Sequence, residues 1–332
     1  MTQLFIIGNG FDINLGMKTG YQDFYDYYKD IKNDDPDIIA MKQNIEAGRY
    51  TTWSDLEAGL GEYTEQFDKP EVFIKCIEDI KSVLAQFLSM QYENRAFQSD
   101  FNKILDDFRN PDRYLDQQIM NNYYRYLRDN IPNTSKDESA IVTFNYTSTL
   151  EGLTTINSIR QFPILHIHGY INDSIVLGVN DVEQIANLSF RSNRNIKEEF
   201  IKPDFNTACL NDRNGTFEAM ISKADVIILF GLSLGETDRK WWRLIGEKMT
   251  NNKRDVALLY FPYDNKKDTI SHPNYKLRWT ESYQKQLLSV FGLSDDQVQV
   301  FLKRTFIGIN KDIFKLPQKP SIKEKASSSE TR

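Results

Sequence analysis

The chain has 332 residues, which is enough for one large core or for a core with an inserted module. Its hydrophobic and charged fractions, 40% and 27%, are ordinary for a globular protein, and its formal net charge of −6 argues against a main task of coating nucleic acid. The two cysteines, Cys76 and Cys209, exclude a disulfide framework and a cysteine-rich zinc site. The first residues lack the pattern of a signal peptide, and no segment has the roughly 18 apolar residues of a membrane span, so we expect a cytoplasmic protein without a membrane partner.

The first predicted element is a buried strand at Leu4–Ile7, a continuous apolar run that ends at a Gly-Asn-Gly turn. Gly8 and Gly10 let the backbone approach a phosphate closely, and the N–H groups that follow can face an anion. The full dinucleotide fingerprint needs a small residue where Ile13 stands, so this is not the turn of a dehydrogenase. A phosphate-binding turn and a plain strand-to-helix turn both stay open at this point.

Residues 21–130 are predicted to form several amphipathic helices, because apolar residues recur at helical spacing in a stretch rich in charged and amide side chains. Within this stretch, Ser54 and Glu57 have the spacing of a capping box, which favours a helix that begins after Ser54. The alternative is that Glu57 reaches a ligand pocket from the helical module and acts on ribose hydroxyls or on water.

The second half of the chain has the pattern of a parallel sheet, in which apolar runs alternate with helical stretches. A helix over Asp238–Asn251 separates the last two strongly apolar runs, as in a crossover unit, and a final strand is expected within Gln297–Phe306. The other predicted strands are Ala140–Phe144, Phe162–Ile167, Ser174–Leu177, Asp225–Phe230 and Asp255–Phe261.

The domain organisation follows from these elements. Residues 1–20 and 131–316 are predicted to form an open, doubly wound α/β core, with residues 21–130 as a helical module inserted after the first strand. Residues 317–332 are rich in Pro, Lys, Ser and Glu and are expected to be a disordered tail.

Polar residues follow several predicted strands, at the points where ligands of open α/β sheets bind. Asn145 offers both a donor and an acceptor; alternatively, it turns the chain and caps the next helix. His166 and His168 are two of only three histidines, and alternation along a strand places both on one face. A zinc site needs a third ligand and none offers itself nearby, so no metal is expected. His168 is the better candidate for chemistry, whereas His166 is expected to pack or to orient its neighbours.

The turn after the predicted strand Asp225–Phe230 offers further candidates. Gly231 and Ser233 are placed to touch phosphate or ribose, and Thr237 and Asp238 are expected to begin the next helix, with Asp238 as its cap.

That next helix carries the one basic and aromatic cluster worth testing for nucleic-acid binding, which consists of Arg239, Lys240, Trp241, Trp242 and Arg243. We interpret it instead as a helix with a buried tryptophan face.

The order of these motifs resembles the sirtuin superfamily, whose members carry a glycine-rich opening turn, an Asn motif after a strand, a His-Gly pair and a later Gly-Ser-type turn. The closer resemblance is to the bacterial AbiH family, named for bacteriophage abortive infection, and it covers most of residues 1 to about 265. The segments that carry it are Ile7–Asp12 with Gly16, Thr19, Tyr21 and Phe24, then Trp53–Glu57, Phe144–Thr147, His168–Gly169, Leu177–Asp181 and Gly231–Asp238. The resemblance implies a sirtuin-like, Rossmann-like open parallel sheet with a large helical insertion.

The sirtuin resemblance also implies an NAD site. His168 would be the acid–base residue, and Asn145 would hold the nicotinamide ribose or the attacking water. Gly8 and Gly10 with their neighbours would cradle the phosphates, and Gly231 with Ser233 would line the adenosine side. The full set of expected NAD contacts is Gly8, Asn9, Gly10, Phe11, Asp12, Thr19, Thr147, Gly231 and Ser233, with Glu57 and His166 as additional candidates.

Two departures from the sirtuin pattern matter. Thr147 stands where many sirtuins have an Asp, which weakens the expected nicotinamide contact, and the chain cannot form the four-cysteine zinc ribbon of deacetylases. Zinc-free sirtuin-like proteins in phage defence tend to hydrolyse NAD, so the resemblance implies an antiphage enzyme that converts NAD to nicotinamide and ADP-ribose, without another cofactor.

Two alternatives belong to other functional classes: a sensor that binds NAD or ADP-ribose without turnover and signals to a partner, and a defence protein that acts on nucleic acid. A free NAD hydrolase would poison its own cell, so a homo-oligomer or a regulatory partner protein is expected to control it.

Overall fold

The computed structural model describes residues 1–94, 101–132, 138–156, 162–251, 254–263, 273–309 and 312–316. Within these residues, six parallel strands form one open sheet in the order β3-β2-β1-β4-β5-β6. The strands are β1 (Thr2–Ile7), β2 (Glu138–Thr143), β3 (Ile164–His166), β4 (Val226–Phe230), β5 (Ala257–Phe261) and β6 (Thr305–Ile307). This strand order is that of Rossmann-like folds, so the α/β open parallel sheet is confirmed.

The central strands are continuous apolar runs because both of their faces are buried. Every residue of β4 and of β5 is buried, and the last four residues of β1 are buried as well. The strand order reverses between β1 and β4, which are neighbours in the sheet. In open α/β sheets the crevice at such a point, outside the carboxyl ends of the strands, is where ligands bind.

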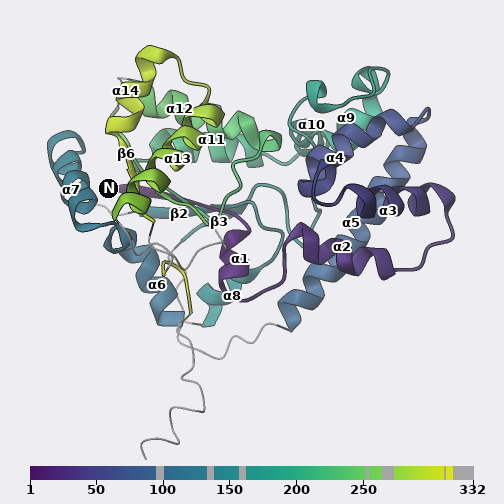
Figure 1. Cartoon of the computed structure of the whole chain (residues 1–332), viewed down its shortest axis with the longest axis horizontal. Coiled ribbons are helices and arrows are strands. Elements are labelled where there is room, and N and C mark those ends of the chain that lie inside the picture. Colours follow the sequence, from purple (N-terminus) through teal and green to yellow (C-terminus); the bar gives the residue numbers. More distant parts are fainter. Residues whose placement is uncertain are drawn as a thin grey trace, which may run out of the picture.

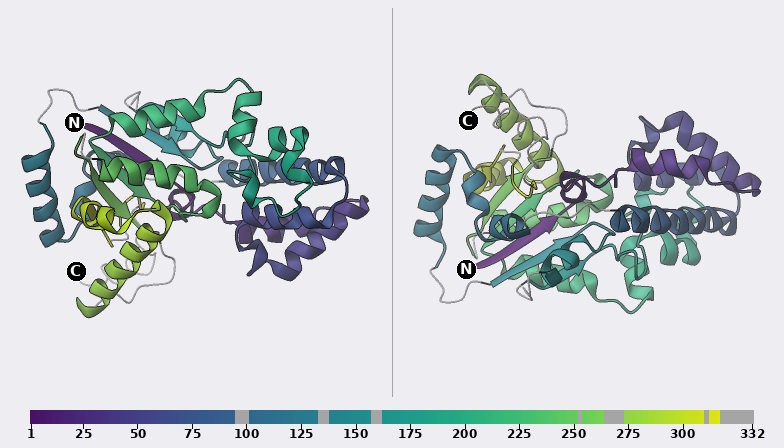
Figure 2. Two further views of the ribbon diagram at one scale, coloured as in Figure 1. Left: turned by 90° about the horizontal axis from the view of Figure 1, so that it is seen from above. Right: turned by 90° about the horizontal axis from the view of Figure 1, so that it is seen from below.

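Helices cover both faces of this sheet (Figures 1 and 2). Along β1, Leu4 and Ile6 belong to one hydrophobic cluster, and Phe5 and Ile7 belong to the cluster on the opposite face, as the alternation of side chains in a strand requires. The first cluster includes residues of α11 (Arg213–Lys223), α12 (Arg239–Thr250), α13 (Pro273–Phe291) and α14 (Asp295–Lys303). The second includes residues of α1 (Gly10–Asn14), α6 (Phe101–Arg109), α7 (Gln117–Asn130) and α8 (Thr149–Ile156).

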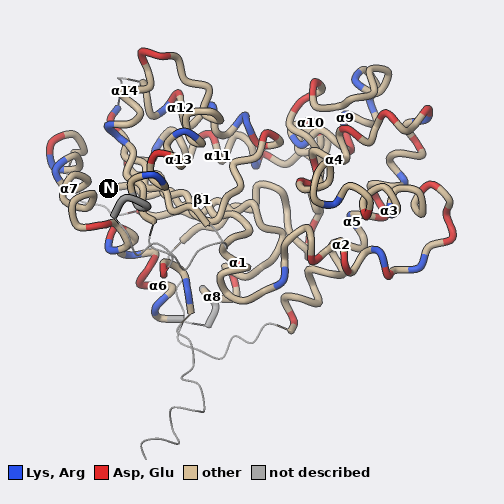
Figure 3. The backbone as a smooth tube through the Cα atoms, viewed as in Figure 1, with Lys and Arg blue, Asp and Glu red and all other residues tan. Residues whose placement is uncertain are grey.

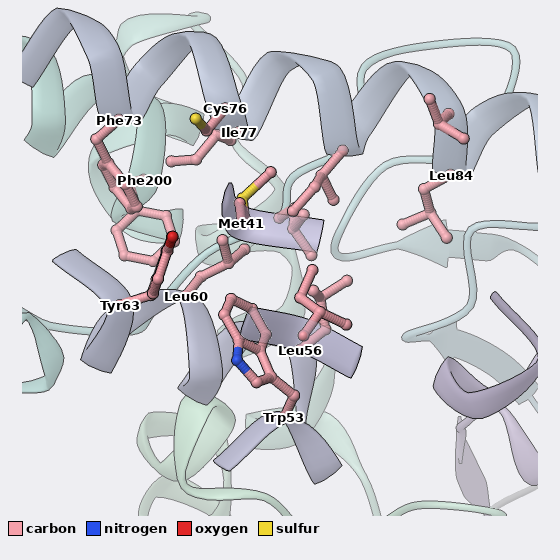
Figure 4. Packing of buried hydrophobic residues seen from close by; sticks show 14 of the residues in the cluster. Met41, Trp53, Leu56, Leu60, Tyr63, Phe73, Cys76, Ile77, Leu84 and Phe200 are labelled. Atoms are coloured by element: carbon pink, nitrogen blue, oxygen red, sulfur yellow. The ribbon is translucent and has the colours of Figure 1, made fainter. Parts of the chain in front are cut away.

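A separate hydrophobic cluster holds the remaining helices together, and we refer to these helices as the helical unit. They are α2 (Tyr21–Asp30), α3 (Pro36–Gly48), α4 (Leu56–Tyr63), α5 (Pro70–Glu93) and α9 (Arg194–Phe200), with α10 (Lys202–Ala208) packed against α9. Figure 4 shows Trp53, Leu56 and Leu60 facing the long helix α5. The helical unit extends to one side of the sheet (Figure 2), so the molecule has two bodies with separate cores.

The residues of the helical unit differ from those of the helical module that was expected at residues 21–130. Helices α6 and α7 pack on the sheet, where the rings of Phe108 and Phe5 lie 5.0 Å apart between centroids. Residues between Ile175 and Ile201, in contrast, join the core of the helical unit. Helical periodicity predicts that a segment buries one face, but it does not say against which partner.

Three strand predictions need correction. Residues 174–177 form no strand, although Val176 N–H donates one hydrogen bond to His168 O. Most of residues 297–306 lie in α14, and only Thr305 and Phe306 belong to β6. Strand β3 ends at His166, earlier than expected. The predicted tail at 317–332 lies outside the described residues.

The surface carries both signs of charge on both bodies (Figure 3). In the part of the chain that the structure describes, no helix has both the length and the apolar character that a bilayer crossing requires. Trp241 and Trp242 are both buried in α12, so the basic and aromatic cluster offers no exposed ring for stacking on nucleic-acid bases.

Candidate functional site

A cavity of about 340 Å³ lies at the carboxyl ends of β1, β2 and β4, next to the helical unit. Its wall brings together most of the site residues predicted from the sequence, which are Gly8, Asn9, Gly10, Asp12, Thr19, Glu57, Asn145, Thr147, His168, Gly231 and Ser233. The wall also has an aromatic part that the sequence did not indicate, composed of Tyr21, Phe144, Tyr146, Trp242 and Tyr263. Segments far apart along the chain therefore meet at one edge of the sheet.

Two of the predicted residues do not line this cavity. Phe11 is fully buried in the sheet core, where its ring lies 5.4 Å from that of Phe314. His166 supports the site from behind, with Nδ1 donating to the backbone oxygen of Asn145 at 3.0 Å and Nε2 lying 2.7 Å from Glu151 Oε1. The expected ligand contact of Phe11 is therefore replaced by a packing role, whereas His166 orients its neighbours as its position in the motif indicated.

The glycines at the floor of the cavity bring two turns into backbone contact. Gly8 N–H donates to Phe230 O and Gly10 N–H donates to Gly231 O, each at 2.9 Å. A Cβ atom on Gly10 would lie 2.6 Å from the Cα of Gly231, whose φ of +70° itself favours glycine. The amides of Gly8 and Gly10 are thus used within the protein, which corrects the expectation that they cradle a phosphate.

Asn9 and Thr19 form a closed pair above this floor. Thr19 Oγ1 donates to Asn9 Oδ1 at 2.6 Å, and Asn9 Nδ2 donates to the backbone oxygen of Thr19 at 2.8 Å. The pair ties the turn after β1 to the segment that leads into α2, so it fixes the shape of the wall.

Asp12 is a buried carboxylic acid on the β1 side of the cavity. Its Oδ2 accepts a hydrogen bond of 2.6 Å from Thr147 Oγ1, and Thr149 Oγ1 in turn donates to Thr147 Oγ1 at 3.0 Å. Burial raises the pKa of Asp12 to about 6, against the lowering effect of hydrogen bonding to Thr147, Thr149 and Asn145 and of the charge of His166. Asp12 is therefore mostly ionised at neutral pH, but it gains a proton about two pH units above the usual range.

Asn145 follows β2 and is fixed through its backbone. Its N–H donates to Thr143 Oγ1 at 3.1 Å, and its carbonyl accepts from His166. The side-chain oxygen Oδ1 is buried and has no hydrogen-bond partner among the described residues. The alternative in which this oxygen caps α8 is therefore wrong, and Oδ1 lies in the cavity wall without a hydrogen bond to a described residue.

On the opposite side of the cavity, Lys202 joins the helical unit to the sheet. Its Nζ lies 2.6 Å from Glu57 Oε2, on α4, and 3.0 Å from Asp238 Oδ1, in the loop after β4. The side chains of Lys202 and Glu57 are each only 5% exposed, and Gly178 N–H also donates to Glu57 Oε1 at 3.3 Å. Sequence reasoning missed Lys202, because a lysine followed by a proline at a helix start has the pattern of an exposed residue.

The predicted capping box at Ser54 and Glu57 is wrong. Asp55 caps α4, since its side chain accepts from Glu57 N at 2.9 Å and from Ala58 N at 3.1 Å. Ser54 Oγ donates instead to Thr51 O. The cap is one residue later than expected. The side chain of Glu57 is therefore not used in a capping box, and it lines the cavity and pairs with Lys202.

His168 lies beyond the end of β3, in a turn that needs Gly169 at a φ of +70°. Its ring meets the edge of Phe144, with centroids 5.0 Å apart. Nε2 lies 3.0 Å from Asp238 Oδ1 but out of line for a hydrogen bond with any described residue. Because β3 ends at His166, His168 is not part of the strand, so the expectation that one strand face carries both histidines is wrong. Asp238 makes no capping hydrogen bond, which also corrects its expected role.

The ionisable groups on this side influence one another strongly. Burial raises the pKa of Glu57 to about 7, although Lys202 acts against this. Burial would also raise the pKa of Asp238, but Lys202 and His168 outweigh it and hold that pKa below its ordinary value. Burial and the positive charge of Lys202 lower the pKa of His168, which leaves its imidazole neutral at neutral pH. A neutral, buried imidazole beside a carboxylate is suited to accept a proton.

No group of three or more His, Cys, Asp or Glu side chains in the described residues is arranged to hold a metal ion. The cavity wall offers carboxylates, an amide and an imidazole for chemistry.

The fold and this cavity together define a Rossmann-like α/β protein with a cavity at the point where the strand order reverses, which is where ligands of such folds bind. Residues 4–260 match the family model described as "Bacteriophage abortive infection AbiH". The chain therefore belongs to the AbiH family, as its motifs indicated, and the family's name places it in abortive-infection defence against phage. A comparison with curated proteins found no significant match.

Proposed function

We propose that this AbiH protein hydrolyses the bond between nicotinamide and ribose in NAD, which would deplete NAD in an infected cell. The observation that carries the proposal is the convergence of Asn145, His168 and the glycine turns on one cavity. The resemblance of these motifs to those of sirtuins supports NAD as the substrate.

In the proposed reaction, the bond between C1′ of the ribose and the pyridinium nitrogen breaks, and its electron pair goes to the nitrogen. The transition state resembles an oxocarbenium ion, and nicotinamide leaves as a neutral molecule that needs no proton. Water forms the new bond to C1′ and releases one proton. His168 is placed to take this proton, and the amide of Asn145 to hold the water or the ribose.

The charge of the cavity is compatible with a cationic leaving group. The wall carries the carboxylates of Asp12, Asp55, Glu57 and Asp238, of which Glu57 and Asp238 are paired with Lys202. Negative charge near a developing oxocarbenium ion favours the transition state electrostatically. Because the amides of Gly8 and Gly10 are already paired, recognition of NAD at this floor depends on the ribose and nicotinamide rather than on these two amides.

The test is incubation of the purified protein with NAD and detection of free nicotinamide by chromatography. We expect His168→Ala and Asn145→Ala to reduce the rate by roughly 100- to 10,000-fold, in the range of general acid–base and positioning effects. Asn121→Ala, which changes an exposed asparagine of α7, is the matched control and is expected to leave the rate unchanged. Undiminished cleavage by both cavity variants would refute the assigned roles.

Calorimetry with NAD and with ADP-ribose separates hydrolysis from sensing. Binding that is lost in the Asn145 variant, with no nicotinamide released by the wild-type protein, would replace the hydrolase by the sensor.

A further inference from the structure

Two hydrogen-bond acceptors on the β1 side of the cavity lack donors. Oδ1 of Asp12 and Oδ1 of Asn145 are both buried, and neither has a hydrogen-bond partner among the described residues. Asp12 is 1% exposed and Asn145 is 6% exposed, and both line the cavity. Buried polar atoms in native proteins almost always have partners, so two orphans in one cavity wall indicate that a ligand or water supplies them.

The two residues are neighbours, because the side chain of Asn145 is one of the hydrogen-bonding groups that lower the pKa of Asp12. The oxygen Oδ1 of each residue is still without a hydrogen bond to a described residue. Thr147 occupies only Oδ2 of Asp12, which fixes the carboxylate and leaves Oδ1 available. Two adjacent acceptors call for a ligand with two adjacent donors. A phosphate has no donors when it is ionised and would be repelled by the carboxylate, whereas a ribose offers two neighbouring hydroxyl groups.

We propose that Asp12 is a further catalytic residue, whose Oδ1 accepts a hydrogen bond from the 2′-hydroxyl of the ribose that carries nicotinamide, while Asn145 Oδ1 accepts from the 3′-hydroxyl. The inference rests on the proposed NAD hydrolysis. It adds Asp12 to the residues that act in the reaction and names the ribose hydroxyl group that this residue binds. The 2′-hydroxyl is attached to the carbon next to C1′. As positive charge develops at C1′, the hydrogen bond from this hydroxyl to a carboxylate strengthens, and the proton stays on the hydroxyl.

This role explains why an aspartate is buried here without an ion pair to any described residue, although the imidazole of His166 acts on its charge. Thr147 and Thr149 are neutral, so they orient the carboxylate without neutralising it. A full negative charge is thereby kept for the transition state.

The experiment compares two substrates, NAD and the analogue that lacks the 2′-hydroxyl on the nicotinamide ribose. For each substrate, kcat/KM of Asp12→Asn is divided by that of the wild-type protein, so the different intrinsic reactivities of the two substrates cancel. Asparagine has the shape of aspartate and lacks its charge. We expect a loss of roughly 100-fold with NAD and a change of less than about fivefold with the 2′-deoxy analogue.

A second variant and a control complete the design. Thr147→Val removes the bond that orients Asp12 and is expected to cause a smaller loss that depends on the 2′-hydroxyl in the same way. Asp68→Asn, at an exposed aspartate, is expected to change neither ratio.

Equal losses on both substrates in Asp12→Asn would overturn the proposal, because they would mean that Asp12 acts on another donor, such as the nicotinamide carboxamide, or only on the fold. If the wild-type protein cleaves neither substrate, the proposed hydrolysis itself fails and this inference fails with it.

Discussion

The cavity wall has two aspartates, the buried Asp12 after β1 and the largely covered Asp238 after β4, and their pKa values shift in opposite directions. Asp12 is surrounded by hydroxyl groups, and burial raises its pKa to about 6. Asp238 lies between Lys202 and His168, whose attraction outweighs burial and lowers its pKa. Both residues come shortly after an apolar strand in the sequence, so their local context is alike. The difference between the two pKa values comes from Lys202, which belongs to the helical unit and pairs with Asp238. The two carboxylates are therefore expected to have different roles.

On the Asp238 side, the charges are paired and hold the two bodies and His168 in place. On the Asp12 side, the carboxylate forms no ion pair with a described residue, and its Oδ1 lies in the cavity wall without a hydrogen-bond partner there. The comparison therefore predicts that the first side contributes to stability and that the second reduces stability while it serves activity.

The largest effect on stability is expected when Lys202, which pairs with Glu57 and Asp238, is replaced. Lys202→Met leaves Glu57 and Asp238 buried without a counter-ion, so the free energy of unfolding should fall by about 3–5 kcal/mol in urea titrations. Lys240→Met, which breaks a partly exposed pair with Glu218, is the control and should lose less than about 1 kcal/mol. If both variants lose equally little, Lys202 does not join the two bodies.

Asp12→Asn is expected to stabilise the protein. The folded pKa of about 6 lies above the unfolded value, so the folded state disfavours the ionised form and stability falls as pH rises from about 4 to 6. Removing the charge should raise the free energy of unfolding by about 1–3 kcal/mol at pH 7.5, and the gain should shrink by about half at pH 5. Thermal unfolding at the two pH values measures this difference, and a gain that grows in acid would contradict the assignment.

Asp238→Asn tests how the paired side controls His168. The carboxylate of Asp238 raises the pKa of His168 against burial and Lys202, so its removal should lower that pKa further. We expect the acidic limb of the kcat/KM profile for NAD to move to lower pH and the rate at its maximum to fall by roughly 10- to 100-fold. A lower rate with an unmoved limb would show that Asp238 acts on the fold rather than on the imidazole.

The smallest effect concerns Asp55, another carboxylate of the same wall. Its side chain caps α4, so Asp55→Ala should reduce the free energy of unfolding by about 1 kcal/mol. Ser54→Ala should change it by less than about 0.5 kcal/mol, since Ser54 is not the cap. A larger loss at Ser54 than at Asp55 would restore the capping box that the sequence favoured.

Much of the sheet was predictable because its central strands are buried on both faces and stand out as continuous apolar runs. The convergence of Asn145 and the turn at Gly231 was also predictable, since parallel strands end at the same edge of a sheet. The strand expected at residues 174–177 has a β-branched composition but is not part of the sheet, and composition alone cannot distinguish a strand from an extended loop.

The less predictable part of the site depends on contacts between distant segments. Lys202 reaches Glu57 across 145 positions of the chain, and no local pattern reports such a pairing. For the same reason, the roles of Glu57 and Asp238 were assigned to helix caps, which are local and common, although the tertiary contacts with Lys202 determine where both side chains lie.

The three glycines beneath the cavity have a consequence for how this site can diversify. Because Gly8, Gly10 and Gly231 bring two turns together through main-chain atoms, a side chain at any of these positions would force the ends of β1 and β4 apart. The floor thus offers no freedom for adjusting ligand preference. A relative with different specificity must obtain it from the surrounding walls, which are made of side chains contributed by both bodies.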